Sequence, residues 1–440
     1  MSGLLEELLA HPLDRSEQNR LRARERLRII GLPDARHEGW RYTPVRSLLT
    51  WPLHAPEVDP EVEVPELPED LIEDLEALEP DFIYVDGVMQ EEEDESDDEE
   101  EEFEERFDNF EDLPDFDEPD LDRAQPYSRL HPDFLEDGFE LANIAFNQGG
   151  LVLDIDAESG IEDGVDPDAE QTLVLAYVSS SEPAGFPHVR HRIRVGAGQS
   201  LTLVEHFLHE PDSKQALNLG HEIELEAGAT LRWVRMGDMG DANQLLGFAR
   251  LRLEAGASVH LYELTRGAGL YRQATQVDLS GVGARCEATA VLAIDGRRHA
   301  DLQWRVDHRA RDTSADLKMR GLVSGRGKLS VGGSLIVHAG ADGTDTRLSN
   351  KNLLLSEHAE VNTKPVLEID ADEVKAAHGA TVGQLDERAL FYMRSRGLPE
   401  TLARQLLTRA FAFEVISGVD DDSLKALLDM ALTKMMAKPA

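Results

Sequence analysis

The chain has 440 residues, enough to bury a large core, and its formal net charge of −43 argues against nucleic acid or an anionic membrane as a direct partner. No apolar run approaches the roughly 20 residues needed to cross a bilayer. Cys286 is the only cysteine, so this chain alone cannot form a disulfide, a zinc knuckle or a cluster held by several thiols. The first residues mix leucines with acids and lack the basic start of a signal peptide. We therefore expect a cytoplasmic protein with a buried thiol.

The N-terminal region, residues 1–88, is predicted to contain helices and a connector. The run SEQNRLRARERLRII at residues 16–30 spaces apolar residues among charges, and Gly31 and Pro33 stop the helix. A connector rich in proline and glutamate follows at about residues 52–81, and FIYVDGV then predicts a strand and a turn.

Within this region, residues 39–44 read GWRYTP, a compact aromatic and basic cluster. Trp40 and Tyr42, with Arg41 between them, would suit the wall of a ligand pocket. The alternative, which we favour, is that the cluster pins a helix to a neighbouring domain.

An acidic insertion is predicted at residues 89–125. From Glu91 to Asp122 there are 21 Asp or Glu residues against a single arginine. Such a block repels itself and cannot bury enough apolar surface to fold, so we predict disorder. Phe103, Phe107 and Phe110 lie at near-helical spacing, which leaves a short docking helix as the alternative.

Residues 126–376 are predicted to form a β core. A glycine-containing turn followed by alternating apolar and polar residues starts at Val195, again 30 residues later at Leu225, and again 28 residues later at Leu253. A sandwich and a coil of stacked strands both fit this density of strands. The repeated unit of turn and strand favours the coil, a β-helix in which each rung buries its inner face on its neighbours.

The C-terminal region, residues 377–440, is predicted to be a helical domain. Extended chain gives way after about Val374 to a glycine-punctuated turn at residues 378–383, and a helix is expected from Asp386 to its stop at Gly397. Two further helices are expected, one from near Pro399 and one from near Asp422.

Most of the histidines are predicted to be structural residues rather than metal ligands or catalytic groups. The pairs His188/His191 and His206/His209 are three apart, a spacing that puts side chains on opposite faces of a strand and prevents local chelation. His308 lies on an apolar strand face and is predicted to be a core residue. The sequence shows neither a nucleotide-binding loop nor a nucleophile elbow, so no self-contained active site is expected.

His378 differs because of its position at the junction of the β core and the helices. Small neighbours, Ala376, Ala377 and Gly379, leave its imidazole approachable, and a neutral imidazole is a competent iron ligand. On chemistry alone, a structural histidine remains the alternative.

The stretch around His378, KPVLEIDADEVKAAHGATVGQLDERALFYMRSRGLP at residues 364–399, resembles the C-terminal signature of the SufD family. These proteins are subunits of the Suf machinery that assembles iron–sulfur clusters. GTDTRLSNKNLLLSEHAEVNTKP just upstream and GWRYTP near the N-terminus also fit. The resemblance covers most of residues 1–90 and 130–440.

This resemblance implies a right-handed parallel β-helix between helical N-terminal and C-terminal regions. It implies pairing with the homologous subunit SufB through the β-helix, and binding of the ABC-type ATPase SufC by the C-terminal helices. It also implies that His378 contributes to a nascent Fe–S cluster, or iron, shared with SufB rather than held tightly by this chain. SufD relatives often carry a cysteine at the position of Ala376, and the acidic insertion lies outside the family pattern.

We therefore predict a non-catalytic scaffold subunit, with the ATPase activity residing in SufC. Two alternatives stay open. One is a carbohydrate-active β-helix enzyme, which would need carboxylates clustered on one face of the coil. The other is an interaction module with no metal role.

Overall fold

The computed structural model describes residues 18–34, 36–49, 77–90, 137–147, 149–155, 171–181, 185–419 and 421–437, together with residues 68, 71, 72 and 75. The predicted acidic insertion at residues 89–125 lies outside these ranges except for its first two residues, which end a strand. The predicted connector at residues 52–81 also lies mostly outside them.

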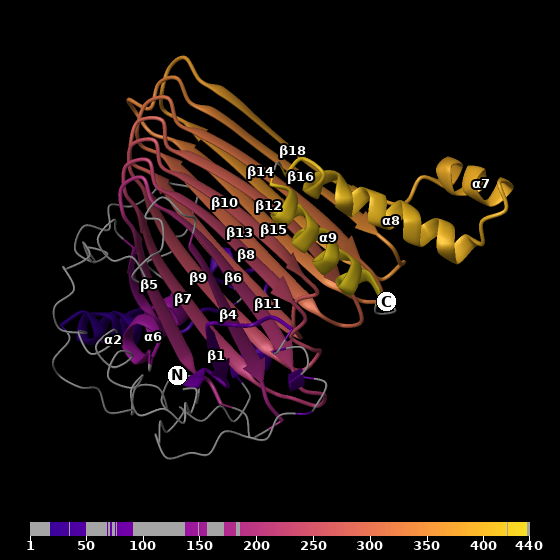
Figure 1. The fold of residues 1–440 in the computed structure, drawn as a ribbon, viewed down its shortest axis with the longest axis horizontal. Coiled ribbons are helices and arrows are strands. Elements are labelled where there is room, and N and C mark those ends of the chain that lie inside the picture. Colours follow the sequence, from indigo (N-terminus) through magenta and orange to yellow (C-terminus); the bar gives the residue numbers. More distant parts are fainter. Residues whose placement is uncertain are drawn as a thin grey trace.

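The body is a solenoid built from two sheets (Figure 1). The larger sheet contains, in spatial order, β18 (Lys375–Gly383), β16 (Asp345–Leu354), β14 (Ser314–Val323), β12 (Arg285–Ile294), β10 (Ser258–Thr265), β8 (Thr230–Gly237), β6 (Ser200–His209), β4 (Gln171–Ser179), β1 (Phe82–Val85) and β2 (Val88–Gln90). The smaller sheet contains β17 (Glu360–Ile369), β15 (Lys328–Val337), β13 (His299–His308), β11 (Leu270–Leu279), β9 (Gln244–Leu253), β7 (Ala216–Leu225), β5 (His188–Val195) and β3 (Val152–Ile155).

From β5 to β18 the chain alternates between the two sheets, so each pair of consecutive strands forms one rung. The strands of successive rungs pair in parallel, and the short hairpin of β1 and β2 is antiparallel. The predicted β-helix is confirmed.

The repeat seen in the sequence corresponds to one corner of the solenoid. Each of its three copies begins on the last residue of a strand of the smaller sheet and continues into a strand of the larger one. At this corner Gly198, Gly228 and Gly256 adopt φ of 72°, 74° and 68°, a conformation that favours glycine. The glycine recurs because every rung must turn there.

The space between the sheets holds the main core. Leu302, Trp304 and Val306 alternate along β13 and are buried in it. His308 continues that face, and its ring nitrogens lie 2.8 Å from the Thr313 hydroxyl and 3.1 Å from the Thr346 hydroxyl. The prediction of a core histidine is confirmed.

The described N-terminal helices are α2 (Gln18–Ile30), the 3-10 helix η1 (Glu38–Trp40) and α3 (Arg46–Leu49), and a further helix, α6 (Gly138–Phe146), lies at the start of the predicted β core. Helix α2 ends at Ile30, as predicted. Helix α6 was not predicted, because it is only nine residues long and eight of them are buried, so it shows no sustained exposed polar face. Side chains of α2 and α6 form a second core with the outer face of the smaller sheet, at β7, β9 and β11.

Trp40 fixes the N-terminal segment to the solenoid. It is buried against Phe139, its Nε1–H donates to Asp137 Oδ2 at 2.6 Å, and the Arg272 guanidinium lies over its ring at 4.0 Å. The packing role predicted for GWRYTP is therefore confirmed for Trp40. Arg41 and Tyr42 remain exposed.

The C-terminal helices are α7 (Glu387–Ser395), α8 (Glu400–Ile416) and α9 (Asp422–Ala437). Asp386 caps α7 by accepting from the Arg388 N–H at 2.8 Å, as predicted. Helices α8 and α9 pack on the outer face of the larger sheet, where Val234, Leu264 and Val291 meet them. Helix α7 lies away from the solenoid (Figure 1).

The turn predicted at residues 378–383 is wrong, because these residues belong to strand β18. Glycines disfavour a strand, but here the backbone pairs with β16 as far as Gly383, and that pairing outweighs local preference. The division into segments 1–88, 89–125, 126–376 and 377–440 stays a prediction. The helices of the last segment begin at Glu387.

Candidate functional site

His378 lies on the last strand of the larger sheet, at one end of the solenoid. Strand β18 pairs with β16 on one side, and no described strand pairs with its other edge. In the register of this ladder His378 aligns with Leu348, a core residue that is 4% exposed. Aligned residues of parallel strands share a face, so His378 occupies an inward-facing position on the terminal rung.

His378 is in fact the last member of a column that runs along the inside of the larger sheet. The aligned residues are Leu173, Leu203, Trp233, Leu261, Ala288, Leu317, Leu348 and His378. Each earlier residue of the column is covered by the next rung. His378 has no described rung beyond it and is exposed. The column thus ends in an imidazole that a second polypeptide could cover.

The surroundings of His378 are open. None of the described residues gives its imidazole a hydrogen bond or an ion pair, and a Cβ added to Gly379 or Gly383 would meet nothing within 4 Å. Ala376 and Ala380 share the inward side of β18 with His378 and offer no donor atom. On that side of the strand, His378 alone could bind a metal.

The single thiol lies too far away to join His378. Cys286 aligns, through β14 and β16, with Ala376, three strands further along. At about 4.8 Å between neighbouring strands, that separation is about 14 Å. Cys286 is also sealed in the core, where burial raises the pKa of its thiol to about 12. The prediction of a buried thiol is confirmed.

A second group of donor atoms, which the sequence analysis did not find, lies deep inside the solenoid. His191, Glu205 and His221 offer ligand atoms that all lie within 4.8 Å of one another, and all three are buried. His191 and His221 align on neighbouring strands. Their spacing of 30 residues equals the distance between the first two copies of the repeat. That equality could have predicted from the sequence that the two histidines lie side by side.

The contacts of Glu205 show that this group is a hydrogen-bonded network. One carboxylate oxygen accepts from Tyr177 at 2.8 Å and lies 2.9 Å from His221 Nε2. The other accepts from Trp233 Nε1 and Arg235 Nε, both at 2.8 Å. A metal ion would have to displace these donors and sit beside the Arg235 guanidinium.

The histidines of this network are neutral. Burial lowers the pKa of His191 to about 3 and also lowers that of His221. Because the Leu151 N–H donates to His191 Nδ1 at 3.0 Å, the proton of this ring is on Nε2, which faces the Tyr177 hydroxyl at 2.8 Å. Burial alone would raise the pKa of Glu205, but His221 and Arg235 outweigh it and lower that pKa. The network therefore holds an ionised carboxylate inside the first rungs.

These features define a class of protein: a β-solenoid whose last rung is uncovered and carries an accessible histidine. Residues 177–411, more than half of the chain, match the family described as SUF system FeS cluster assembly, SufBD core domain. The chain belongs to that family.

Individual relatives agree with this assignment. The Escherichia coli iron-sulfur cluster assembly protein SufD is 28% identical over 256 residues, which cover 58% of this chain and 60% of that protein. An iron-sulfur cluster assembly SufBD family protein of Mycobacterium bovis is 28% identical over 255 residues, 56% of this chain and 63% of its own length. One from Synechocystis is 31% identical over 212 residues, 48% of this chain and 47% of its own. The SufD resemblance is confirmed, although the chain spans less than two thirds of these relatives.

Proposed function

We propose that this chain is a scaffold subunit of the Suf iron–sulfur assembly machinery, working in the cytoplasm and completing its site with a second subunit. The observation that carries the proposal is the uncovered terminal rung with an exposed histidine on its inward side. Among the described helices, none is both long and apolar enough to span a membrane.

The partner at the open end is, on this proposal, SufB. Strands β17 and β18 are the last strands of their sheets, and one edge of each lacks a described neighbour. The free edges of β17, ten residues long, and β18, nine residues long, offer unpaired N–H and C=O groups to strands of another chain. A homologous solenoid placed end to end would extend both sheets and cover His378.

The second partner is the ATPase SufC, bound through the C-terminal helices. Phe391 and Tyr392 on α7 are 72% and 58% exposed, which is unusual for aromatic side chains on a helix. With the ATP chemistry in SufC, this chain is not an enzyme.

The cargo is iron or a nascent cluster shared with SufB. His378 would supply one nitrogen ligand, and the thiolates that such clusters require would come from the partner, since Cys286 cannot reach the open end. Ala376 lies two residues from His378 on the same side of β18, so its side chain leaves that ligand position without a donor.

The two other candidate functions are weaker. A glycoside-cleaving enzyme needs an accessible pair of carboxylates, whereas Glu205 on β6 and Glu263 on β10, two rungs apart, are both sealed inside the solenoid. A metal-free interaction module would share the open end but would not need His378, so it makes a different prediction for a variant at this position.

Co-expression with SufB and SufC tests the proposal. We expect a complex of the three subunits to purify, and we expect His378→Ala to leave the complex intact while lowering the iron and sulfide that it accumulates on reconstitution. His358→Ala, an exposed histidine in the turn before β17, is the control and should not change the yield. Failure to form the complex would refute the scaffold, and an unchanged cluster yield in His378→Ala would favour the metal-free module.

A further inference from the structure

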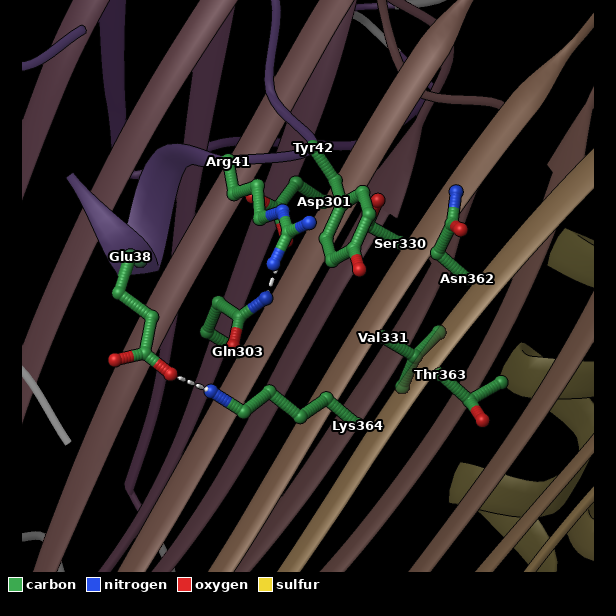
Figure 2. A pocket seen from close by; sticks show the side chains of 11 residues that line it. Glu38, Arg41, Tyr42, Asp301, Gln303, Ser330, Val331, Asn362, Thr363 and Lys364 are labelled. Carbon is green, nitrogen blue, oxygen red and sulfur yellow. Dashed lines mark hydrogen bonds and ion pairs between the residues drawn. The ribbon is translucent and has the colours of Figure 1, made fainter. Parts of the chain in front are cut away.

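A cavity of about 210 Å³ lies on the outside of the solenoid, between the N-terminal segment at residues 38–42 and strands β13, β15 and β17 (Figure 2). Its floor is the outer face of the smaller sheet, so it is separate from the inward-facing position of His378. Its roof includes Arg41 and Tyr42, two exposed residues of the GWRYTP cluster.

A buried hydroxyl in the floor lacks a partner. Ser330 is 3% exposed and lines the cavity, and its Oγ has no hydrogen-bond partner among the described residues. A buried hydroxyl without a partner costs stability, and native proteins nearly always satisfy such groups. A polar atom in the cavity would satisfy this one.

The charges around the cavity leave one cation uncompensated. Asp301 is neutralised by Arg272 and also accepts from Gln303 Nε2 at 2.5 Å. Lys364 on β17 forms an ion pair with Glu38 across the cavity, as Figure 2 shows.

Arg41 has no ion-pair partner among the described residues, and its guanidinium lies 5.7 Å from the centre of the Tyr42 ring. The Arg41 guanidinium would pair with an anionic group, and the exposed Tyr42 ring beside it would stack on a planar ring of the same ligand.

We propose that this cavity binds a small aromatic carboxylate. The carboxylate pairs with the Arg41 guanidinium and accepts from the Ser330 hydroxyl, and the flat body of the ligand lies against the Tyr42 ring. The volume is below the range of about 300–1,000 Å³ of pockets for drug-sized ligands, so the ligand is about the size of benzoate. Once bound, it ties the N-terminal segment to β15, the strand that carries Ser330.

The test is calorimetric titration of the full chain with benzoate, and with benzylamine as a probe of similar shape and opposite charge. We expect saturable binding of benzoate and none of benzylamine. Arg41→Gln should weaken benzoate binding about tenfold or more, because it removes a charged partner. Ser330→Ala should weaken it less, without loss of thermal stability, since the hydroxyl has no partner in the free protein.

Arg285→Gln is the matched control, an exposed arginine on β12 of the other sheet, and it should bind benzoate as the wild type does. Three results would each overturn the proposal: no saturable binding of benzoate, equal binding of benzylamine, or equal affinities of Arg41→Gln and Arg285→Gln. Arg41 is exposed, so its variant should fold normally, and a thermal melt checks this.

Discussion

At the scale of single residues, Glu205 is the side chain on which the interior network depends. It is fully buried, and its two oxygens together contact four polar groups. In the ladder of the larger sheet it aligns with Arg235, which aligns in turn with Glu263. The chain thus places a short column of alternating charges inside an apolar solenoid, where each buried charge is stabilised by the opposite charge on the neighbouring strand.

We predict that Glu205→Gln destabilises the protein by about 3–5 kcal/mol, because it keeps the shape of the side chain but removes the carboxylate that is hydrogen-bonded to the buried Arg235. Urea denaturation followed by tryptophan fluorescence measures the change. Glu287→Gln is the control, since Glu287 is largely exposed and lies 3.5 Å from His260, and it should cost less than about 1 kcal/mol. A loss in Glu205→Gln as small as that of the control would contradict this account of the network.

The sequence predicted individual residues where their local context is decisive. His308 lies on a strongly apolar strand face, and its burial followed from that pattern. The group of His191, Glu205 and His221 was not predicted, because it forms between strands, and its members meet only once the length of a rung is known. The three-residue spacing of His188 and His191 predicted opposite faces of the strand, and His188 contacts Phe186 outside the solenoid while His191 lies inside it. The spacing said nothing about the next rung.

At the scale of elements, the free edge of β18 has a defined chemistry. The Lys375 N–H donates to the Thr344 carbonyl at 2.8 Å. Along a strand the direction of the backbone groups alternates, so odd-numbered residues of β18 face β16, and even-numbered residues direct their N–H and C=O groups to the free edge. Ala377 therefore belongs to the ladder within the chain, and Ala380 to the edge that a partner would use.

Two proline variants separate these roles. Ala380→Pro removes an N–H from the free edge only and follows Gly379, which tolerates a proline after it, so we expect little change in thermal stability and weaker binding of SufB in a pull-down. Ala377→Pro removes a ladder bond to β16 and should lower the stability of the isolated chain. If Ala380→Pro bound SufB like the wild type, the free edge of β18 would not be the interface.

Prediction of elements succeeded where the sequence repeats itself. The glycine corners and the alternation between them indicated the stacked strands, and the capping residue Asp386 and the stop at Gly397 indicated α7. It failed at residues 378–383, where three local features (two glycines and a histidine) suggested a turn, because pairing with β16 is a long-range effect. It also missed α6, because a helix of nine residues, eight of them buried, is too short to show a sustained helical pattern.

At the scale of the whole molecule, buried neutral histidines couple folding to pH. Burial lowers the pKa of His191 to about 3 and those of His299 and His308 to about 4, against an ordinary value of about 6.5 in the unfolded chain. Below about pH 6.5 the unfolded chain therefore binds more protons than the folded chain does. The stability that these histidines contribute is fully present above about pH 6.5 and is lost as the pH falls below that value. Asp137 has the opposite effect on stability. Burial raises its pKa to about 6, so the folded chain binds this proton more readily than the unfolded chain, and protonation of Asp137 favours folding as the pH falls.

We predict a lower free energy of unfolding at pH 5 than at pH 7.5. Each of the three histidines contributes a loss of up to about 2 kcal/mol at pH 5, and Asp137 recovers about 1 kcal/mol. Urea denaturation at a series of pH values measures the net loss, which should be a few kcal/mol. A stability that is flat between these pH values would show that these histidines are not buried and neutral.

The central claim is that the open end of the solenoid is the surface that a second Suf subunit covers. Amide hydrogen exchange of β17 and β18, compared between the chain alone and the chain with SufB, tests it most directly, with β14 inside the sheet as the reference. We predict that the edge amides exchange quickly in the isolated chain and become protected in the complex, while β14 changes little. Unchanged exchange in β17 and β18, with new protection only on another surface such as α7, would contradict the claim.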